Sequence, residues 1–377
     1  MISRQMLKRC RRLVVKVGTS TLTYANGHLH LQRIEGLVRE MADLHNRGLE
    51  VLLVSSGAIG VGADRMGYKK IPRTMPEKQA LAAIGQGALM HLYEKLFAEY
   101  GKTVAQVLLT RGDLDERIRY LNASSALQAL LNMKVIPIIN ENDTVVVEEI
   151  KFGDNDTLSA MVAAIVDADL LIILSDVEGL YDCDPRVNEK ASLQTQVTEI
   201  TSVMEDNSHN RGSRFSSGGM LTKLKAARIC MAAGVPMVIA NGGNDNVVRR
   251  VVSGEEIGTL FVPREEKLSG RKKWIAFGTV PQGQVTVDEG AGEALLEKGK
   301  SLLPSGITGV DGDFDRGTVV SVLINNGPEI ARGIVNYSSE EIRQIAGKKS
   351  SEIQKILHEK DYDEVIHRNN LWVEDMQ

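Results

Sequence analysis

The feature that most restricts the fold of this chain is an alternation of short apolar runs with stretches of helical periodicity. Gly48 suits the position just after a helix whose apolar residues recur at helical spacing, namely Ile34, Leu37, Val38, Met41 and Leu44. Further helical stretches are expected at 120–134, 154–169 and 218–234. The apolar runs read as strands at 12–18, 50–54, 104–110, 135–139, 170–174, 236–242 and 258–263. Short runs joined through helices predict an α/β domain with a mostly parallel sheet sandwiched by helices.

The pattern changes after residue 263, where a polar segment rich in charge and glycine begins. Beyond it come short strands and turns, and then a polar tail with helical tendency. We therefore expect a first domain over 1–263, a linker over 264–280 and a small β-rich domain over 281–377, a division that suits 377 residues.

The charge, the cysteines and the apolar runs exclude several classes of protein. A net charge of −4 gives no general attraction to nucleic acid or to an anionic membrane. Cys10, Cys183 and Cys230 are odd in number and match no metal spacing, which favours reduced thiols. No signal-like segment precedes the first strand, and the longest apolar run, LLIIL from Leu170, is too short to span a bilayer. We expect a cytoplasmic protein.

Polar residues gather directly after the predicted strands, where ligands bind in open α/β sheets. Lys16-Val17-Gly18-Thr19-Ser20 closes the first strand, and Ser55-Ser56-Gly57 follows the second. Later strands lead into 140–143 and Ser175-Asp176. The chain has no GxxxxGK[ST] loop and no GxSxG elbow, and GVGADR and GQGALM lack the final glycine of a dinucleotide fingerprint. A P-loop enzyme, a dinucleotide-binding enzyme and a serine hydrolase are all disfavoured.

Two lysines raise the question of an anionic ligand. Lys16 lies within an apolar strand, where an ammonium group needs an anionic partner or an exit to solvent. Lys223 follows a Gly-Gly pair at a predicted helix start, which suits either a phosphate or an ordinary N-cap. Two lysines on one phosphoryl group would stabilise charge on its oxygens. Two other motifs also have ordinary structural explanations. GDND at 153–156 could be only a helix cap, and SSGAIG could be only a tight turn.

Seven motifs in order resemble the amino acid kinase family: VVKVGTS, SSGAI, LLTRGDL, INENDTV, GDNDTLSA, SDVEGLYDCDPR and GGMLTK. Within that family, INEND and GDND favour the glutamate kinase branch. DEGA and LLPSGI extend the resemblance into the C-terminal module, which is similar to a PUA domain. One departure is Ser216-Ser217, where the family usually has Gly-Thr; a hydroxyl is kept but the backbone freedom of a glycine is lost.

The resemblance implies ATP-dependent phosphorylation of the γ-carboxylate of L-glutamate to γ-glutamyl phosphate, the first step of proline biosynthesis. It implies catalytic roles for Lys16 and Lys223, which would contact the phosphates, and for Asp156, which would organise the two lysines. The implied substrate-binding residues are Ser56, Gly57, Asn140, Asp143, Asp154 and Asn155. The implied ATP-binding residues are Lys16, Ser175, Asp176, Ser217, Gly218, Gly219, Met220, Leu221, Thr222 and Lys223.

The same resemblance implies Mg²⁺ bridging the nucleotide phosphates with no assigned protein ligand, and proline as a feedback inhibitor. A homo-oligomer and a downstream γ-glutamyl phosphate reductase are further expected partners. Two alternatives stay open: another amino acid kinase acting on N-acetylglutamate, aspartate or carbamate, and an RNA-interacting protein. Residues 275–377 hold ten Lys and Arg against seventeen Asp and Glu, a difference of −7, so nucleic-acid binding is not expected.

Overall fold

The computed structural model describes residues 4–24, 27–68, 70–145, 154–183, 188, 190–201, 204, 219–263, 272, 274–325 and 327–373. The chain forms two compact units. Unit 1 contains residues 1–113 and 121–267, and unit 2 contains residues 114–120 and 268–377. The division at 263 and 281 that the sequence suggests stays a proposal, since most of 264–273 lies outside the described residues.

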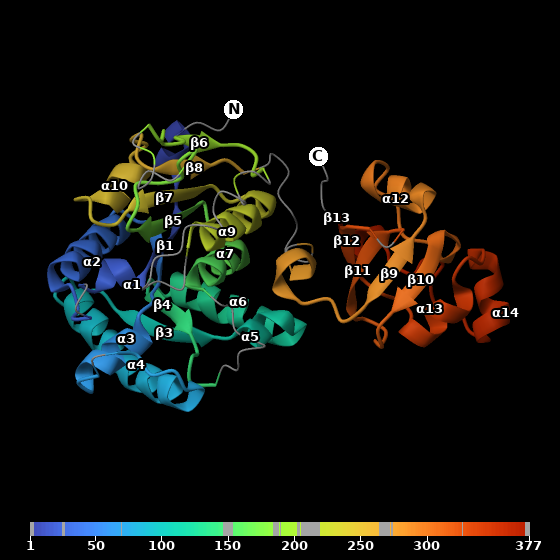
Figure 1. Ribbon diagram of the computed structural model, residues 1–377, viewed down its shortest axis with the longest axis horizontal. Coiled ribbons are helices and arrows are strands. Elements are labelled where there is room, and N and C mark those ends of the chain that lie inside the picture. Colours follow the sequence, from blue (N-terminus) through green and yellow to red (C-terminus); the bar gives the residue numbers. More distant parts are fainter. Residues whose placement is uncertain are drawn as a thin grey trace. The chain divides into compact units, whose positions relative to one another are not determined.

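Unit 1 is built on an eight-stranded sheet in the order β3-β4-β2-β1-β5-β7-β8-β6 (Figure 1). All neighbours pair in parallel except β7 and β8, which are antiparallel. The mostly parallel sheet expected from the sequence is confirmed. Its strands are β1 (Arg12–Val17), β2 (Glu50–Val54), β3 (Val104–Leu109), β4 (Ile136–Glu141), β5 (Leu170–Ser175), β6 (Gln196–Val197), β7 (Met237–Asn241) and β8 (Thr259–Phe261).

Helices cover both faces of this sheet (Figure 1). The predicted helix before Gly48 is α2, and Gly48 has the positive φ of 90° that a residue just past a helix end commonly adopts. The long helix α4 was not predicted. The helices are η1 (Arg4–Arg9), α1 (Thr19–Leu22), α2 (Leu31–Asn46), α3 (Ala58–Arg65), α4 (Met75–Ala98), α5 (Arg111–Asp115), α6 (Arg117–Asn132), α7 (Asn155–Ile165), α9 (Met220–Ala233) and α10 (Val247–Val252).

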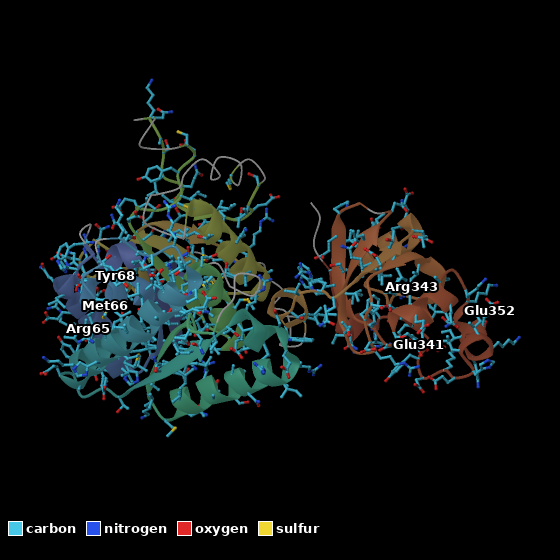
Figure 2. The ribbon with its side chains drawn as sticks, turned by 60° about the horizontal axis from the view of Figure 1, so that its bottom comes forward. Arg65, Met66, Tyr68, Glu341, Arg343 and Glu352 are labelled. Carbon is cyan, nitrogen blue, oxygen red and sulfur yellow. The ribbon has the colours of Figure 1, made fainter. Side chains whose placement is uncertain are left out.

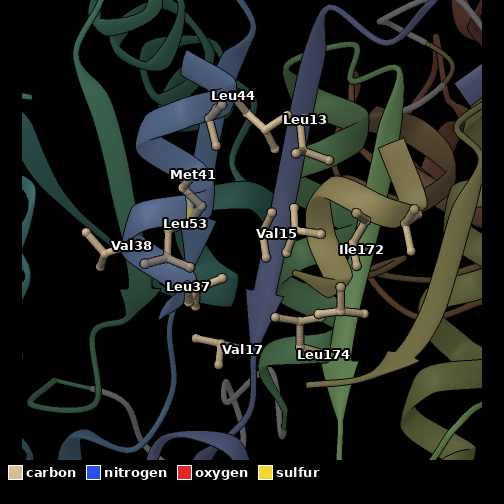
Figure 3. Close-up of a cluster of buried hydrophobic side chains, with 14 of the residues drawn as sticks. Leu13, Val15, Val17, Leu37, Val38, Met41, Leu44, Leu53, Ile172 and Leu174 are labelled. Carbon is tan, nitrogen blue, oxygen red and sulfur yellow. The ribbon is translucent and has the colours of Figure 1, made fainter. Parts of the chain in front are cut away.

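Strand alternation divides β1 between the two faces. Leu13, Val15 and Val17 join the apolar cluster under α2, together with Ile172 and Leu174 of β5 (Figure 3). Successive strand side chains point to opposite faces, so Lys16 belongs to the other face of the sheet. There its Cα pairs in register with buried Val54 of β2 and Ile173 of β5. The sequence therefore places an ammonium group on the central strand of a buried sheet.

Two glycines let the backbones of α3 and α4 cross closely. A Cβ on Gly62 would lie 1.9 Å from the carbonyl oxygen of Leu81, and a Cβ on Gly85 would lie 1.8 Å from that of Ala58. These glycines belong to GVGADR and GQGALM, which fail as nucleotide fingerprints. Their actual role is to allow the helix crossing.

We expect Gly85→Ala to lower the free energy of unfolding by about 1–3 kcal/mol or more, because backbone atoms cannot yield as a flexible side chain can. Gly87→Ala is the matched control on the same helix, since a Cβ there meets nothing within 4 Å. It should raise the free energy of unfolding by about 0.5–1 kcal/mol through helix propensity. Urea denaturation measures both, and changes of the same sign would contradict the crossing argument.

Unit 2 is the small β-rich module that the sequence predicts, with a five-stranded sheet in the order β10-β9-β11-β12-β13. Its core contains Val285, Val322, Ile330 and Tyr337. Ser338 and Glu341 form a capping box at the start of α13. The elements are η3 (Trp274–Gly278), β9 (Gln284–Val287), α12 (Glu289–Leu296), η4 (Pro304–Gly306), β10 (Ile307–Asp311), β11 (Val319–Ile324), β12 (Glu329–Ile334), α13 (Ser339–Ile345), η5 (Ser350–Glu352), α14 (Ile353–Leu357), η6 (Arg368–Asn370) and β13 (Leu371–Val373).

No helix in the described ranges is both long and apolar enough to cross a membrane.

Candidate active site

The parallel strands bring their polar ends to one edge of the unit 1 sheet. Lys16 lies near the end of β1, Ser55 follows β2, Asn140 lies near the end of β4, and Ser175 ends β5. All four residues are buried. Because β1, β2, β4 and β5 run in the same direction, this edge is the one at which open α/β sheets bind ligands.

A buried ion-pair triad occupies this edge. Asp156, in the first turn of α7, lies with one carboxylate oxygen 2.6 Å from Lys16 Nζ and the other 3.2 Å from Lys223 Nζ. Thr222 donates its hydroxyl to the second oxygen at 2.8 Å, or alternatively to the Gly219 carbonyl at 2.8 Å. Lysines from sequence positions more than two hundred residues apart thus converge on one carboxylate.

The triad carries a net positive charge in a buried place. Asp156 is 0% exposed, and Lys16 and Lys223 are each 6% exposed. Burial alone would raise the pKa of Asp156, but the ammonium groups of Lys16 and Lys223 outweigh it and hold that pKa well below its usual range. A carboxylate whose pKa is lowered contributes stability above its unfolded pKa and loses it only as the pH falls through the lowered value. Asp156 therefore stays ionised near neutral pH, and two ammonium groups share its single negative charge.

The start of α7 is fixed by Asp154. Its carboxylate accepts the backbone N–H of Thr157 at 2.7 Å and the Thr157 hydroxyl at 3.2 Å, as expected for an N-cap. Burial, and next the charge of Asp156, raise the pKa of Asp154. The cap sets the first turn of α7 and so directs Asn155 and Asp156 to the sheet edge.

An amide cluster lies beside the triad. Asn155 Nδ2 is 3.0 Å from the Ser55 carbonyl, 2.9 Å from Ser56 Oγ and 3.0 Å from Asn140 Oδ1. Gly57 follows with a φ of 91°, in the left-handed region that favours glycine, and is the N-cap of α3. Asn155 is therefore in direct contact with two other predicted substrate residues, Ser56 and Asn140.

The other predicted residues are placed less closely or lie outside the described part. Asp143 is partly exposed in the turn after β4. The Ser175 hydroxyl donates to the carboxylate of exposed Asp176 at 3.2 Å. Gly219 is the N-cap of α9, and Met220, Leu221 and Thr222 form its first turn. Ser217 and Gly218 fall outside the described residues.

Four residues at this edge were not found by sequence reasoning: Gln86, Glu178, Asn241 and Asn244. Gln86 of α4 accepts a hydrogen bond from Asn140 Nδ2 at 2.7 Å. Glu178 accepts from Asn241 Nδ2 at 2.7 Å and from Asn244 Nδ2 at 3.0 Å, which joins the ends of β5 and β7. The GQG of α4 and the Asn-Gly-Gly-Asn that starts at the last residue of β7 were the available signals.

The amino acid kinase family model matches residues 11–241, which is more than half of the chain. This chain belongs to the amino acid kinase family. A PUA domain model matches residues 283–357, within unit 2. The kinase match contains the whole Lys16–Asp156–Lys223 triad, and it ends with β7.

Curated relatives within the amino acid kinase family match along nearly the whole chain. The glutamate 5-kinase of Moorella thermoacetica is 54% identical over 370 residues, which cover 98% of each chain. The glutamate 5-kinase of Thermoanaerobacter pseudethanolicus is 55% identical over 360 residues, or 96% of this chain and 97% of the relative. That of Geobacter sulfurreducens is 48% identical over 368 residues. Among solved structures, the UMP kinase of Bacillus anthracis aligns with a TM-score of 0.46 and 17% identity, too weak a likeness to bear on the assignment.

Proposed function

We propose that this chain transfers the γ-phosphoryl group of ATP to the γ-carboxylate of L-glutamate, giving ADP and γ-glutamyl phosphate, the first step of proline biosynthesis. The observation that carries the proposal is the buried triad, in which Asp156 holds two ammonium groups at the ligand-binding edge of the sheet. Relatives named glutamate 5-kinase, 54% and 55% identical over nearly the full chain, supply the identity of the acceptor.

The chemistry needs cations more than it needs a base. The γ-carboxylate, with a reference pKa of about 4.3, is ionised at neutral pH and is already a nucleophile. One of its oxygens forms a bond to the γ-phosphorus while the bond from that phosphorus to the bridging oxygen breaks, and ADP departs with the electron pair. The main barrier is the approach of two anions, which Lys16 and Lys223 lower by stabilising charge on the transferring group.

Mg²⁺ would enter the site together with the nucleotide. The described residues contain no cluster of three or more His, Cys, Asp or Glu side chains able to hold a metal. An ion of this kind commonly binds through substrate phosphates, water and one or two carboxylates, and so needs no protein cage. When bound it would supply further charge neutralisation, while the orientation of the lysines is the work of Asp156.

Glutamate would be held by the amide cluster and its neighbours. Ser56 and the backbone N–H groups from Gly57 onwards are suited to a carboxylate, and Asp143 and Asn155 provide acceptors for an ammonium group, with Asn140 and Asp154 nearby. The nucleotide would lie along Ser175, Asp176 and the segment 217–223.

Asp143→Ala is expected to raise KM for glutamate while leaving kcat within a few fold, because the residue is assigned to ground-state binding of the ammonium group. Steady-state kinetics with glutamate varied at saturating ATP measure the effect. A KM for glutamate equal to that of the wild type would remove Asp143 from the substrate site.

The function is tested by trapping the product. Hydroxylamine converts an acyl phosphate into a hydroxamate, so the protein is incubated with ATP, Mg²⁺, hydroxylamine and, in separate reactions, glutamate, N-acetylglutamate, aspartate and carbamate. We expect a hydroxamate with glutamate far in excess of the other acids. A higher yield of hydroxamate with another acid would show that this acid, and not glutamate, is the acceptor.

Further partners follow from the same proposal. Proline would act as a feedback inhibitor at or overlapping the glutamate site, and the protein would work as a homo-oligomer in the cytoplasm. Because an acyl phosphate hydrolyses readily, a γ-glutamyl phosphate reductase would take up the product. Inhibition of hydroxamate formation by added proline tests the first of these.

The charges of unit 2 do not favour RNA as its main ligand. Arg316 forms ion pairs with three carboxylates, those of Glu341, Glu359 and Asp361. Glu341 is labelled in Figure 2, together with Glu352 of the same unit. The hydrogen bond that the Glu341 carboxylate accepts from Arg316 is the main reason that the pKa of Glu341 falls to about 2. A cation paired in this way offers little to a phosphate backbone. We therefore assign unit 2 a structural or regulatory role.

A further inference from the structure

Side-chain amides on α4, β4 and α7 form a hydrogen-bonded chain, and backbone groups determine which atom of each amide donates and which accepts. Asn140 Oδ1 accepts the backbone N–H of Glu141 at 2.9 Å. A backbone N–H can only donate, so this atom of Asn140 has to be its oxygen and not its nitrogen. The amide of Asn140, which is 1% exposed, is thereby oriented without ambiguity.

The orientation of Asn140 passes to the amides on either side. Its nitrogen faces Gln86 at 2.7 Å, so Gln86 has to present its oxygen Oε1 as the acceptor. Its oxygen and the Ser55 carbonyl each lie 3.0 Å from the same atom of Asn155, so Asn155 has to present its nitrogen there. The nitrogen of Asn155 therefore donates to the oxygen of Asn140, and the nitrogen of Asn140 donates to the oxygen of Gln86.

This polarity leaves a specific pair of groups for the substrate. The Oδ1 atom of Asn155 is buried and has no hydrogen-bond partner among the described residues. A buried acceptor cut off from bulk water is satisfied only by a donor enclosed beside it. Ser56 Oγ accepts from Asn155 Nδ2 at 2.9 Å, which leaves the hydroxyl hydrogen of Ser56 free to donate. The pair offers an acceptor to an ammonium group and a donor to a carboxylate.

We propose that Gln86 is a positioning residue that holds Asn140 in place against Asn155, and so keeps the Asn155 oxygen where it can recognise the α-ammonium group of the amino acid substrate. The inference rests on the function proposed above. Gln86 itself does not need to touch the substrate; it supplies the acceptor for the buried nitrogen of Asn140, whose orientation the Glu141 N–H already sets. The neighbouring Gly85 allows α4 to pack closely against the backbone of α3, and this packing fixes the position of the Gln86 backbone.

The experiment compares glutamate with glutarate, which lacks the ammonium group, by hydroxamate formation. Gln86→Met keeps the length of the side chain and its helix propensity but removes the acceptor. We expect the ratio of kcat/KM for glutamate over glutarate to fall about tenfold, mainly through KM for glutamate, because a buried Asn140 nitrogen left without an acceptor favours a displaced Asn140 and moves Asn155 with it. Gln86→Leu, a second apolar replacement, should show the same loss.

Gln86→Glu is the rescue variant, since a carboxylate oxygen can still accept from Asn140, and it should retain most of the discrimination. Gln128→Leu is the matched control: Gln128 is also a helical glutamine that bonds an asparagine, Asn132, at 3.0 Å, but on α6. An unchanged ratio in Gln86→Met, equal loss for glutamate and glutarate, or no rescue by Gln86→Glu would overturn the inference. If the wild-type protein forms no hydroxamate with glutamate, the proposed function fails instead.

Discussion

Replacing Lys223 with alanine is expected to lower kcat for γ-glutamyl hydroxamate formation by at least about a hundredfold, which is typical of the loss of one preorganised charge stabiliser. Lys223 is buried, lies 3.2 Å from Asp156 and belongs to the start of α9. The fold should survive, because Asp156 keeps Lys16 at 2.6 Å. The fall in kcat would therefore reflect lost stabilisation of charge on the transferring phosphoryl group and not unfolding of the protein.

Lys225 provides the matched control for this prediction. It lies two residues further along α9 and is exposed. Lys225→Ala removes the same charge from the same helix, so its kcat should stay within about twofold, since isolated surface charges contribute little. Lys223→Arg tests geometry, because a planar guanidinium does not replace a compact ammonium group. A Lys223→Ala enzyme with kcat within tenfold of the wild type would remove Lys223 from the catalytic machinery.

The sequence predicted the sheet and its polar edge because both depend on local patterns. Apolar runs identify the strands, and the residues after parallel strands have to meet at one edge, which brings Lys16, Ser56, Asn140 and Ser175 to a common place. The resemblance to amino acid kinases then suggested which of these residues act on phosphate and which on the acceptor.

The contribution of α4 could not be found in this way. Its apolar residues and alanines surround the helix with little amphipathic period, so no face is distinguished in the sequence. Its glycines looked like an incomplete nucleotide fingerprint, whereas in the structure Gly85 serves a helix crossing. Gln86 becomes meaningful only when that crossing places it beside Asn140. Such a contact depends on tertiary packing between distant segments, and strand-end motifs give no information about it.

Asp156→Asn is expected to lower the free energy of unfolding by about 3–5 kcal/mol, because removing one partner of a buried ion pair leaves uncompensated charge. Here one carboxylate serves two ammonium groups, those of Lys16 and Lys223, and it is 0% exposed. The kcat should also fall by at least about a hundredfold, since the lysines would repel one another and leave their catalytic positions. Urea denaturation and the hydroxamate assay measure the two effects.

The origin of this destabilisation can be isolated with an anion and a neighbouring variant. Inorganic phosphate should restore part of the lost stability in Asp156→Asn, because an anion between the lysines replaces the missing counter-charge, and should stabilise the wild type less. Asp154→Asn removes a carboxylate only two residues away, but asparagine caps helices as well as aspartate does, so its free energy of unfolding should change by less than about 1 kcal/mol. Equal losses in the two variants, or no response of Asp156→Asn to phosphate, would show that α7 is stabilised by its cap and not by the charge between Lys16 and Lys223.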